Sequence, residues 1–305
     1  MIETRVAWLQ IHLCVVLWGF TAILGKLITL QALPLVIWRM GLVAGALLLL
    51  PRIWRVLKKL PRGLLGAYTG IGVLVALHWL TFYGAIKLAN ASVAVTCIAT
   101  VPVFLSVIEP ILAGRRFQLR ELLLGLVVLP GILLVVGGTP EAMNLGIAVG
   151  ILSALFVALF ASLNKRYVLK ADALTVTAIE MASGCLFLVI LSVALGAADI
   201  SAIQGIVDEP SAVFQLPQGM DLLWMLVLAI GCTLLPFALS LMALRHLSAY
   251  ASALAVNLEP IYAIALAALL LGEQQEVSGG FYLGALIIIA AVLAYPLLMR
   301  PKPRY

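Results

Sequence analysis

Charged residues are scarce in this chain of 305 residues. They make up 10% of it, and hydrophobic residues make up 64%, whereas soluble domains carry about 25% charged residues. A globule of this length cannot bury so much apolar surface, so the excess must face lipid. The composition therefore excludes an ordinary soluble protein and predicts an all-α integral membrane protein. The short alternating segments typical of a membrane β-barrel are not seen in the sequence.

Sequence motifs of common enzymes are also missing. The chain has no Walker A, HExxH or GxGxxG pattern and no convincing Ser/His/Asp arrangement. Its four cysteines lie far apart in apolar runs, with neither CxxC pairs nor metal-ligand spacing. We therefore expect no enzyme, no cofactor and no metal site. The net charge of +6 lies in loops between apolar runs, so it is no evidence for nucleic-acid binding.

Ten apolar runs are long enough to cross a bilayer, which takes about 20 residues in a helix. The short connections between several of them predict antiparallel neighbours. The predicted spans are about 6–28, 33–51, 64–86, 90–112, 120–138, 145–164, 173–196, 221–244, 248–271 and 278–298.

The distribution of Lys and Arg predicts the orientation of these spans. Basic residues occur in the even-numbered loops and in the C-terminal tail, while the long loop at about 197–220 carries three acids. The positive-inside rule then places both termini in the cytoplasm and the long loop outside. The basic residues concerned are Arg52, Arg55, Lys58, Lys59, Arg62, Arg115, Arg116, Arg120, Lys165, Arg166, Lys170, Arg245, Arg300, Lys302 and Arg304.

The ninth apolar run carries Glu259 followed by Pro260 near its middle. A charged group in a membrane helix costs about 2.5–3.5 kcal/mol on insertion scales, and proline frees the carbonyl of Val256 from its helical partner. The buried carboxylate and the freed carbonyl together predict a helix that lines a polar path through the membrane. At helical spacing, polar or small residues share its face, and these are Ser248, Ser252, Ala255, Glu259 and Tyr262.

Two parts of the chain match when they are offset by 158 residues. Pro102 then falls on Pro260 and Gly114 on Gly272, whereas earlier spans match better at an offset near 139. Two repeats of five spans each would enter the membrane with opposite orientation, as in many secondary transporters. We predict an N-terminal repeat at 1–139 and a C-terminal repeat at 140–305, arranged around a central cavity, with Pro102 and Pro260 as equivalent helix kinks.

Short motifs in both repeats resemble the EamA family of the drug/metabolite transporter superfamily. They are Trp18-Gly19, Arg39 after Pro34, Pro102, and Glu259-Pro260 followed by LLLGE up to Glu273. The first repeat departs from the pattern with Gly114-Arg115, where family members often have Gly-Glu. The resemblance implies a ten-helix bundle with a central cavity that moves small metabolites across the inner membrane.

Several side chains in the spans are candidates for substrate binding or coupling. Glu259 is either a proton-linked group or cation contact in a cavity wall, or a structural carboxylate. Arg39 either forms a charge-cancelling pair with Glu180 or binds an anionic group. His78 either packs through a hydrogen bond or serves proton coupling, since imidazole titrates near neutral pH.

Aromatic and amide side chains complete the set of candidates. Trp79, Tyr83 and Trp18 could form an aromatic wall for an organic solute, or pack in the bundle. Asn257 could bond between helices or contact the substrate, and Tyr262 and Ser252 share the face of Glu259.

We expect a secondary carrier in a bacterial-type inner membrane that works by alternating access. Its solute would be an amino acid or related metabolite, with export favoured by family precedent. Within transport, a drug or organic-cation exporter or a facilitator stays open. A lipid-modifying membrane enzyme is the other alternative, although the scattered acids Glu109, Glu180 and Glu259 do not form a metal cluster. The expected partners are the solute and the bilayer, and a homodimer is left open.

Overall fold

The described part of the chain is helical throughout. The computed structural model describes residues 2–114, 116–167, 169–198, 216–243, 245–247, 255–256 and 258–298. The helices are α1 Ile2–Leu27, α2 Ala32–Leu48, α3 Pro51–Leu57, α4 Arg62–Leu88, α5 Ala91–Ile98, α6 Val101–Ala113, α7 Leu119–Leu126, α8 Val128–Gly137, η1 Glu141–Met143, α9 Asn144–Tyr167, α10 Ala173–Ala198, α11 Met220–Leu226, η4 Val227–Leu234, α12 Leu235–Ala243, α14 Glu259–Leu271, η5 Glu273–Gln275 and α15 Gly279–Leu298.

Six helical stretches of the described residues are long and apolar enough to cross a membrane. They are Arg5–Leu27, Arg62–Leu88, Ala91–Ala113, Glu141–Tyr167, Ala173–Leu195 and Met220–Ala243. A seventh would combine α2 and α3, which meet at an angle of 89°, and shorter apolar helices cover Ile261–Leu271 and Gly279–Ala291. The prediction of a multi-span helical membrane protein is confirmed, and the exact number of ten stays a prediction.

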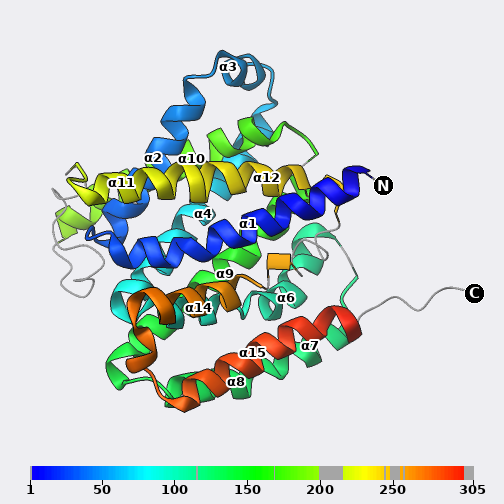
Figure 1. Cartoon of the computed structure of the whole chain (residues 1–305). Helices are drawn as coiled ribbons and strands as arrows, with labels where there is room; N and C mark the ends of the chain where they lie inside the picture. Colours follow the sequence, from blue (N-terminus) through cyan, green and yellow to red (C-terminus); the bar gives the residue numbers. More distant parts are fainter. Residues whose placement is uncertain are drawn as a thin grey trace, which may run out of the picture.

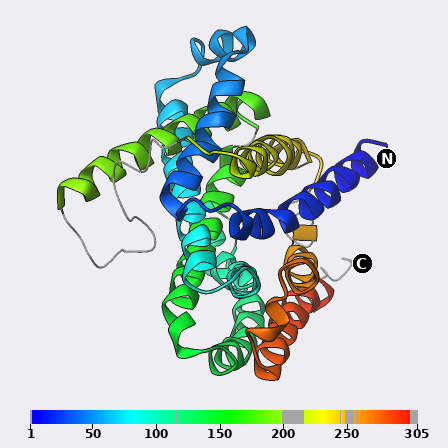
Figure 2. The ribbon, with the colours of Figure 1, turned by 60° about the vertical axis from the view of Figure 1, so that its left-hand side comes forward.

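Helix packing follows the pattern expected of two related repeats. In the first repeat α1 packs on α12 and α14, and its predicted counterpart α9 packs on α4 and α6. In each case the first helix of one repeat contacts the third and fourth spans of the other. Helices α8 and α15 stay side by side in both views (Figures 1 and 2). This exchange of partners is what a two-fold axis between repeats produces.

Helices α6 and α14 have the same length and the same two ends. Each has 13 residues, each has its proline in the first turn, and each ends at a left-handed glycine, Gly114 with φ 72° or Gly272 with φ 71°. The predicted offset of 158 residues is therefore confirmed over this stretch. The span Ala91–Ala113 is interrupted where α5 ends at Ile98 and α6 begins at Val101, directly before Pro102, and the kink at Pro102 stays a prediction. Proline suits that position, where its missing N–H costs no helical bond.

Pro260 likewise lies in the first turn of its helix, since α14 begins at Glu259. The positions 248–254 of the predicted polar stripe lie outside the described residues.

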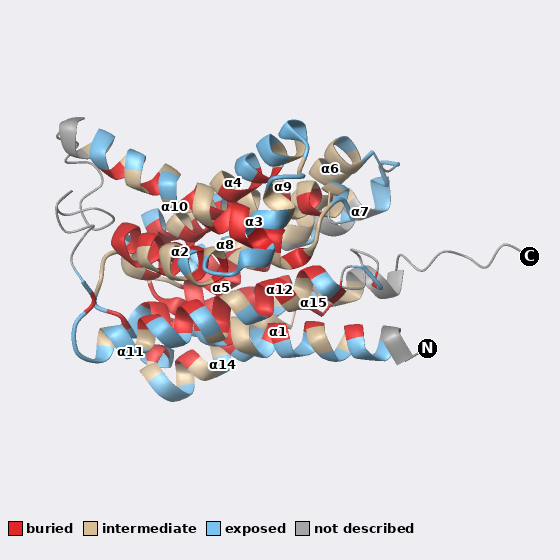
Figure 3. Ribbon diagram, turned by 90° about the horizontal axis from the view of Figure 1, so that it is seen from above, coloured by how far each residue is buried: buried red, intermediate tan, exposed pale blue. Residues whose placement is uncertain are grey.

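Burial runs through the middle of the bundle, and exposed faces point outward (Figure 3). The largest hydrophobic cluster joins α1, α2 and α4 with α10 and η4, so both repeats share one core. Exposed leucines, among them Leu9 at 71% and Leu269 at 82%, suit contact with lipid tails rather than water.

One buried carboxylate joins the two repeats at the end of the bundle predicted to face outside. Glu273, directly after Gly272, accepts hydrogen bonds from the backbone N–H groups of Ala91 (3.0 Å) and Ser92 (2.8 Å) and from the Ser92 hydroxyl (2.8 Å). These N–H groups open α5 and have no partner within that helix. We call this arrangement the Glu273 cap. It ties the last helices of the chain to α5.

Candidate functional site

Arg39 lies near the middle of α2, and its side chain is only 2% exposed. Placing an unpaired guanidinium there would be costly, because the side chain is removed from bulk solvent. The structure satisfies it with polar groups from two other helices.

Three hydrogen bonds fix the guanidinium. Nε donates to the Thr233 hydroxyl at 2.6 Å, Nη1 to the Tyr83 hydroxyl at 2.8 Å and Nη2 to the Cys232 carbonyl at 3.4 Å. The guanidinium carbon lies 3.8 Å from the centroid of the Trp79 ring, close enough for a cation–π interaction. These bonds use three of the five N–H donors of arginine. The other two, one on Nη1 and one on Nη2, have no hydrogen-bond partner among the described residues.

The acceptors on η4 owe their position to an irregular stretch of helix. Val227–Leu234 forms a π-helix, a deviation that often marks a functional site. Pro236 has no N–H, so it cannot bond to the carbonyl of Cys232 in the α-helical pattern. That carbonyl bonds to Arg39 instead, and the Thr233 hydroxyl itself donates to the Leu228 carbonyl at 2.7 Å. Pro236 thus makes the Cys232 carbonyl available to accept a hydrogen bond from the buried Arg39 guanidinium.

Tyr83 on α4 is placed by a glycine on α1. A Cβ atom added at Gly25 would stand 2.6 Å from Cδ1 of the Tyr83 ring, well inside contact distance. The ring is fully buried, so it has little room to move aside. Gly25 therefore allows the tyrosine hydroxyl to reach Arg39.

Glu259 is related to this site by electrostatics and not by a hydrogen bond that the structure shows. It opens α14, and its carboxylate and the Arg39 guanidinium lie within electrostatic range of each other. The structure thus brings Arg39 into contact with Trp79 and Tyr83, with Glu259 of α14 within electrostatic range of the guanidinium.

The predicted pair between Arg39 and Glu180 is wrong. Glu180 on α10 is fully buried, and neither carboxylate oxygen has a hydrogen-bond partner. Arg39 instead turns toward α4 and η4, where it bonds to two hydroxyls and a carbonyl.

His78 packs against α9. Its Nδ1 lies 2.8 Å from the Ser153 hydroxyl, which donates to the His78 carbonyl at 2.9 Å. The ring centroids of His78 and Phe160 are 5.6 Å apart. This geometry agrees with the packing alternative for His78, and the coupling alternative stays untested.

Trp18 and Tyr262 lie where α1 crosses α14. Trp18 packs against the buried cluster that includes Val15 of α1 and Ala243 of α12, while a Cβ at Gly19 would stand 3.3 Å from Cβ of Tyr262. Tyr262 is 45% exposed. Asn257 and Ser252 lie outside the described residues.

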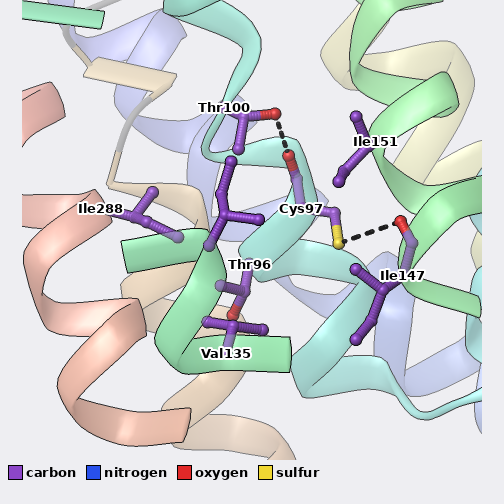
Figure 4. Close-up of a pocket in the computed structure, with 8 residues that line it drawn as sticks. Thr96, Cys97, Thr100, Val135, Ile147, Ile151 and Ile288 are labelled. Atoms are coloured by element: carbon purple, nitrogen blue, oxygen red, sulfur yellow. Dashed lines mark hydrogen bonds between the residues drawn. The ribbon is translucent and has the colours of Figure 1, made fainter. Parts of the chain in front are cut away.

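A small pocket lies apart from Arg39, between α5, α8, α9 and α15 (Figure 4). Its lining is mostly aliphatic, and its Thr100 hydroxyl donates to the Cys97 carbonyl at 2.6 Å. Such a lining offers nothing to a charged solute, so we regard this pocket as a packing gap. In the part of the chain that the structure describes, no cluster of His, Cys, Asp or Glu suits a metal ion.

Sequence reasoning missed the roles of Gly25, Cys232, Thr233 and Glu273. Only Pro236 gave a signal, since a proline four residues after Cys232 predicts a free carbonyl there.

Comparisons with known proteins agree with this fold. The model of the EamA-like transporter family matches residues 6–137 and 144–295. The second match begins at 144 against 6 and ends at 295 against 137, so the offset grows from 138 to 158 residues. A solved structure titled "Crystal structure of protein" is 18% identical, with a TM-score of 0.62, and the match covers 98% of this chain and 97% of that chain. No curated protein matches significantly.

Proposed function

Because this chain belongs to the EamA-like transporter family, we propose that it is a secondary carrier for a small zwitterionic metabolite such as an amino acid. The observation that carries the proposal is the buried Arg39, with two N–H donors left by its protein bonds and Glu259 within electrostatic range. The solute carboxylate would bind Arg39, and its ammonium group would face Glu259. Arg39 in α2 and Glu259 in α14 belong to opposite repeats, so rocking of the repeats would alter their separation.

An organic cation is a weaker candidate. It would use Glu259 together with the faces of Trp18, Trp79 and Tyr83. The Arg39 guanidinium already occupies one face of Trp79, and its positive charge would repel a cationic solute. A membrane enzyme is less favoured still, since the family is one of transporters.

The carrier would work by alternating access in a bacterial-type inner membrane, with both termini in the cytoplasm and export as the main direction. The positive-inside distribution of Lys and Arg supports this orientation. Without an ATP-hydrolysing motif in the sequence, the driving force would be an ion gradient or solute exchange.

A thermal-shift screen of the purified protein with the twenty amino acids tests the proposal. A solute that binds the folded state raises the melting temperature by an amount that grows with its concentration. We expect such a shift for at least one amino acid, and counterflow of that amino acid in liposomes. Arg39→Lys, which keeps the charge but loses the planar fork, should weaken binding about tenfold or more, since a charge-assisted hydrogen bond is worth about 1.5–3 kcal/mol.

Arg52→Lys is the matched control, because Arg52 is exposed on α3. Equal binding by wild type and Arg39→Lys would exclude Arg39 as the carboxylate contact. Absence of any shift and any flux with all twenty amino acids would exclude the solute class.

A further inference from the structure

Glu180 is a buried acid that the proposed solute site does not use. It lies seven residues after Ala173, which starts α10, and so about 10 Å along the helix from that end. Its side chain is fully buried, and neither carboxylate oxygen has a hydrogen-bond partner among the residues that the structure describes. Folded proteins rarely leave even one buried acceptor without a donor, so two on one acid require an explanation.

The groups around Glu180 do not supply a compensating charge. On α9 the amide of Asn164 faces the carboxyl group without normal hydrogen-bond geometry, and its own Oδ1 is likewise without a partner. On α4 the nearest titratable group is Tyr68, whose hydroxyl donates to the carbonyl of Tyr167 at 2.9 Å. On α2 the guanidinium of Arg39 is bound by Tyr83 and η4. Helices α3 and α12 also pack against α10, and the arginines of α3, Arg52 and Arg55, are exposed. Among the described residues, no charged side chain bonds to the Glu180 carboxyl group.

The packing at this position is too tight for a large ligand. A Cβ atom at Gly72 of α4 would overlap the backbone of Glu180, and one at Gly184 of α10 would stand 2.6 Å from the Gly72 carbonyl. Helices α4 and α10, which come from different repeats, therefore touch backbone to backbone beside the carboxyl group. A proton fits such a place, because it needs no volume beyond the oxygen that carries it.

We propose that the Glu180 carboxyl group is a proton-binding site between the two repeats, reached from the end of the bundle where α4 and α10 begin. A proton adds to one carboxylate oxygen as an O–H bond and leaves from the same atom, so the group alternates between a neutral acid and an anion. The neutral acid suits the tightly packed state described here. The anion needs water or a better-placed donor, and separation of α4 and α10 would admit water to it. Proton exchange is thereby linked to relative movement of the repeats, and the inference deepens the proposed carrier function on which it rests.

Infrared spectroscopy of the purified protein in lipid tests this without a transport assay. A protonated carboxyl group has a C=O band that an ionised one lacks. At neutral pH we expect such a band in the wild type, lost in part or whole in Glu180→Gln and unchanged in Glu141→Gln, the control, because Glu141 is exposed in η1. Glutamine has nearly the same shape, so the variant should fold and keep its melting temperature.

Two results would overturn the proposal. One is a wild-type spectrum without a protonated-carboxyl band at neutral pH, which needs no variant at all. The other is a band removed by sodium chloride but not by choline chloride, since that would make Glu180 a sodium site. Because the readout is spectroscopic, failure here leaves the solute site untested, whereas a thermal-shift screen without hits leaves the proton site untouched.

Discussion

The guanidinium carbon of Arg39 lies 3.8 Å from the centroid of the Trp79 ring, and both side chains are buried. The contact joins α2 to α4 in the middle of the bundle. A desolvated cation–π contact of this kind is worth about 2 kcal/mol.

Replacing Trp79 tests that contact. Trp79→Leu should lower the free energy of unfolding by about 3 kcal/mol, since it removes the ring face from a buried cation and leaves a cavity. Trp79→Phe keeps an aromatic face and should lose less. The measurement is thermal or denaturant unfolding in detergent. If leucine and phenylalanine were equally destabilising, packing volume alone would explain the role of Trp79.

Gly25→Ala should disturb the site from α1. The new methyl group would meet the Tyr83 ring at 2.6 Å, and overpacking a buried position costs about 1–3 kcal/mol. We expect a lower melting temperature and weaker solute binding, because the displaced ring carries the hydroxyl that bonds to Arg39. Gly45→Ala on α2 is the control, since a Cβ there meets nothing within 4 Å. Similar behaviour of both variants would refute the role of Gly25.

Glu259→Gln should discriminate between solutes. If Glu259 faces the ammonium group of a zwitterion, the variant should bind an amino acid about tenfold more weakly, the equivalent of about 1.4 kcal/mol. Binding of the N-acetyl derivative, which lacks that charge, should not change. Thermal shifts with both compounds make the comparison. An equal loss for both would show that Glu259 shapes the site without contacting the ammonium group.

Glu273→Ala should destabilise the protein by about 2–4 kcal/mol. It leaves the N–H groups of Ala91 and Ser92 without an acceptor, and a buried unsatisfied group costs about 1–3 kcal/mol. Glu273→Gln keeps one acceptor oxygen and should fall between wild type and Glu273→Ala.

Glu276→Ala is the matched control for the Glu273 cap. Glu276 accepts a bond from Asn90 at 3.0 Å but is exposed, so its loss should cost under about 1 kcal/mol. The order of melting temperatures is the measurement. A Glu276→Ala effect as large as that of Glu273→Ala would count against the cap as a special contact.

The general architecture was readable from the sequence because apolar length and repeat spacing are local properties. Pro102, Pro260 and the glycines that end α6 and α14 could be aligned by counting residues. The individual charges Arg39 and Glu259 stood out because apolar spans seldom carry charge.

The partners of these charges were less accessible, because they depend on how helices cross. Arg39 and Glu180 occupy equivalent spans of the two repeats, so the sequence suggests an ion pair between them. In the structure, Arg39 bonds to Tyr83 and Thr233 instead. The hydrogen bonds from the start of α5 to Glu273 could not be predicted either. No local sequence pattern shows which helix N-terminus a carboxylate 182 residues away will bind.

The Glu273 cap has a consequence for the energetics of the two ends of the molecule. Its equivalent in the first repeat is position 115, next to Gly114, and that position holds arginine. An arginine side chain only donates hydrogen bonds, so it cannot accept from the N–H groups that open a helix. Parting the repeats at the Glu273 end breaks three bonds for which position 115 provides no counterpart. The repeats share one fold, but the contacts that hold the two ends closed therefore differ in kind.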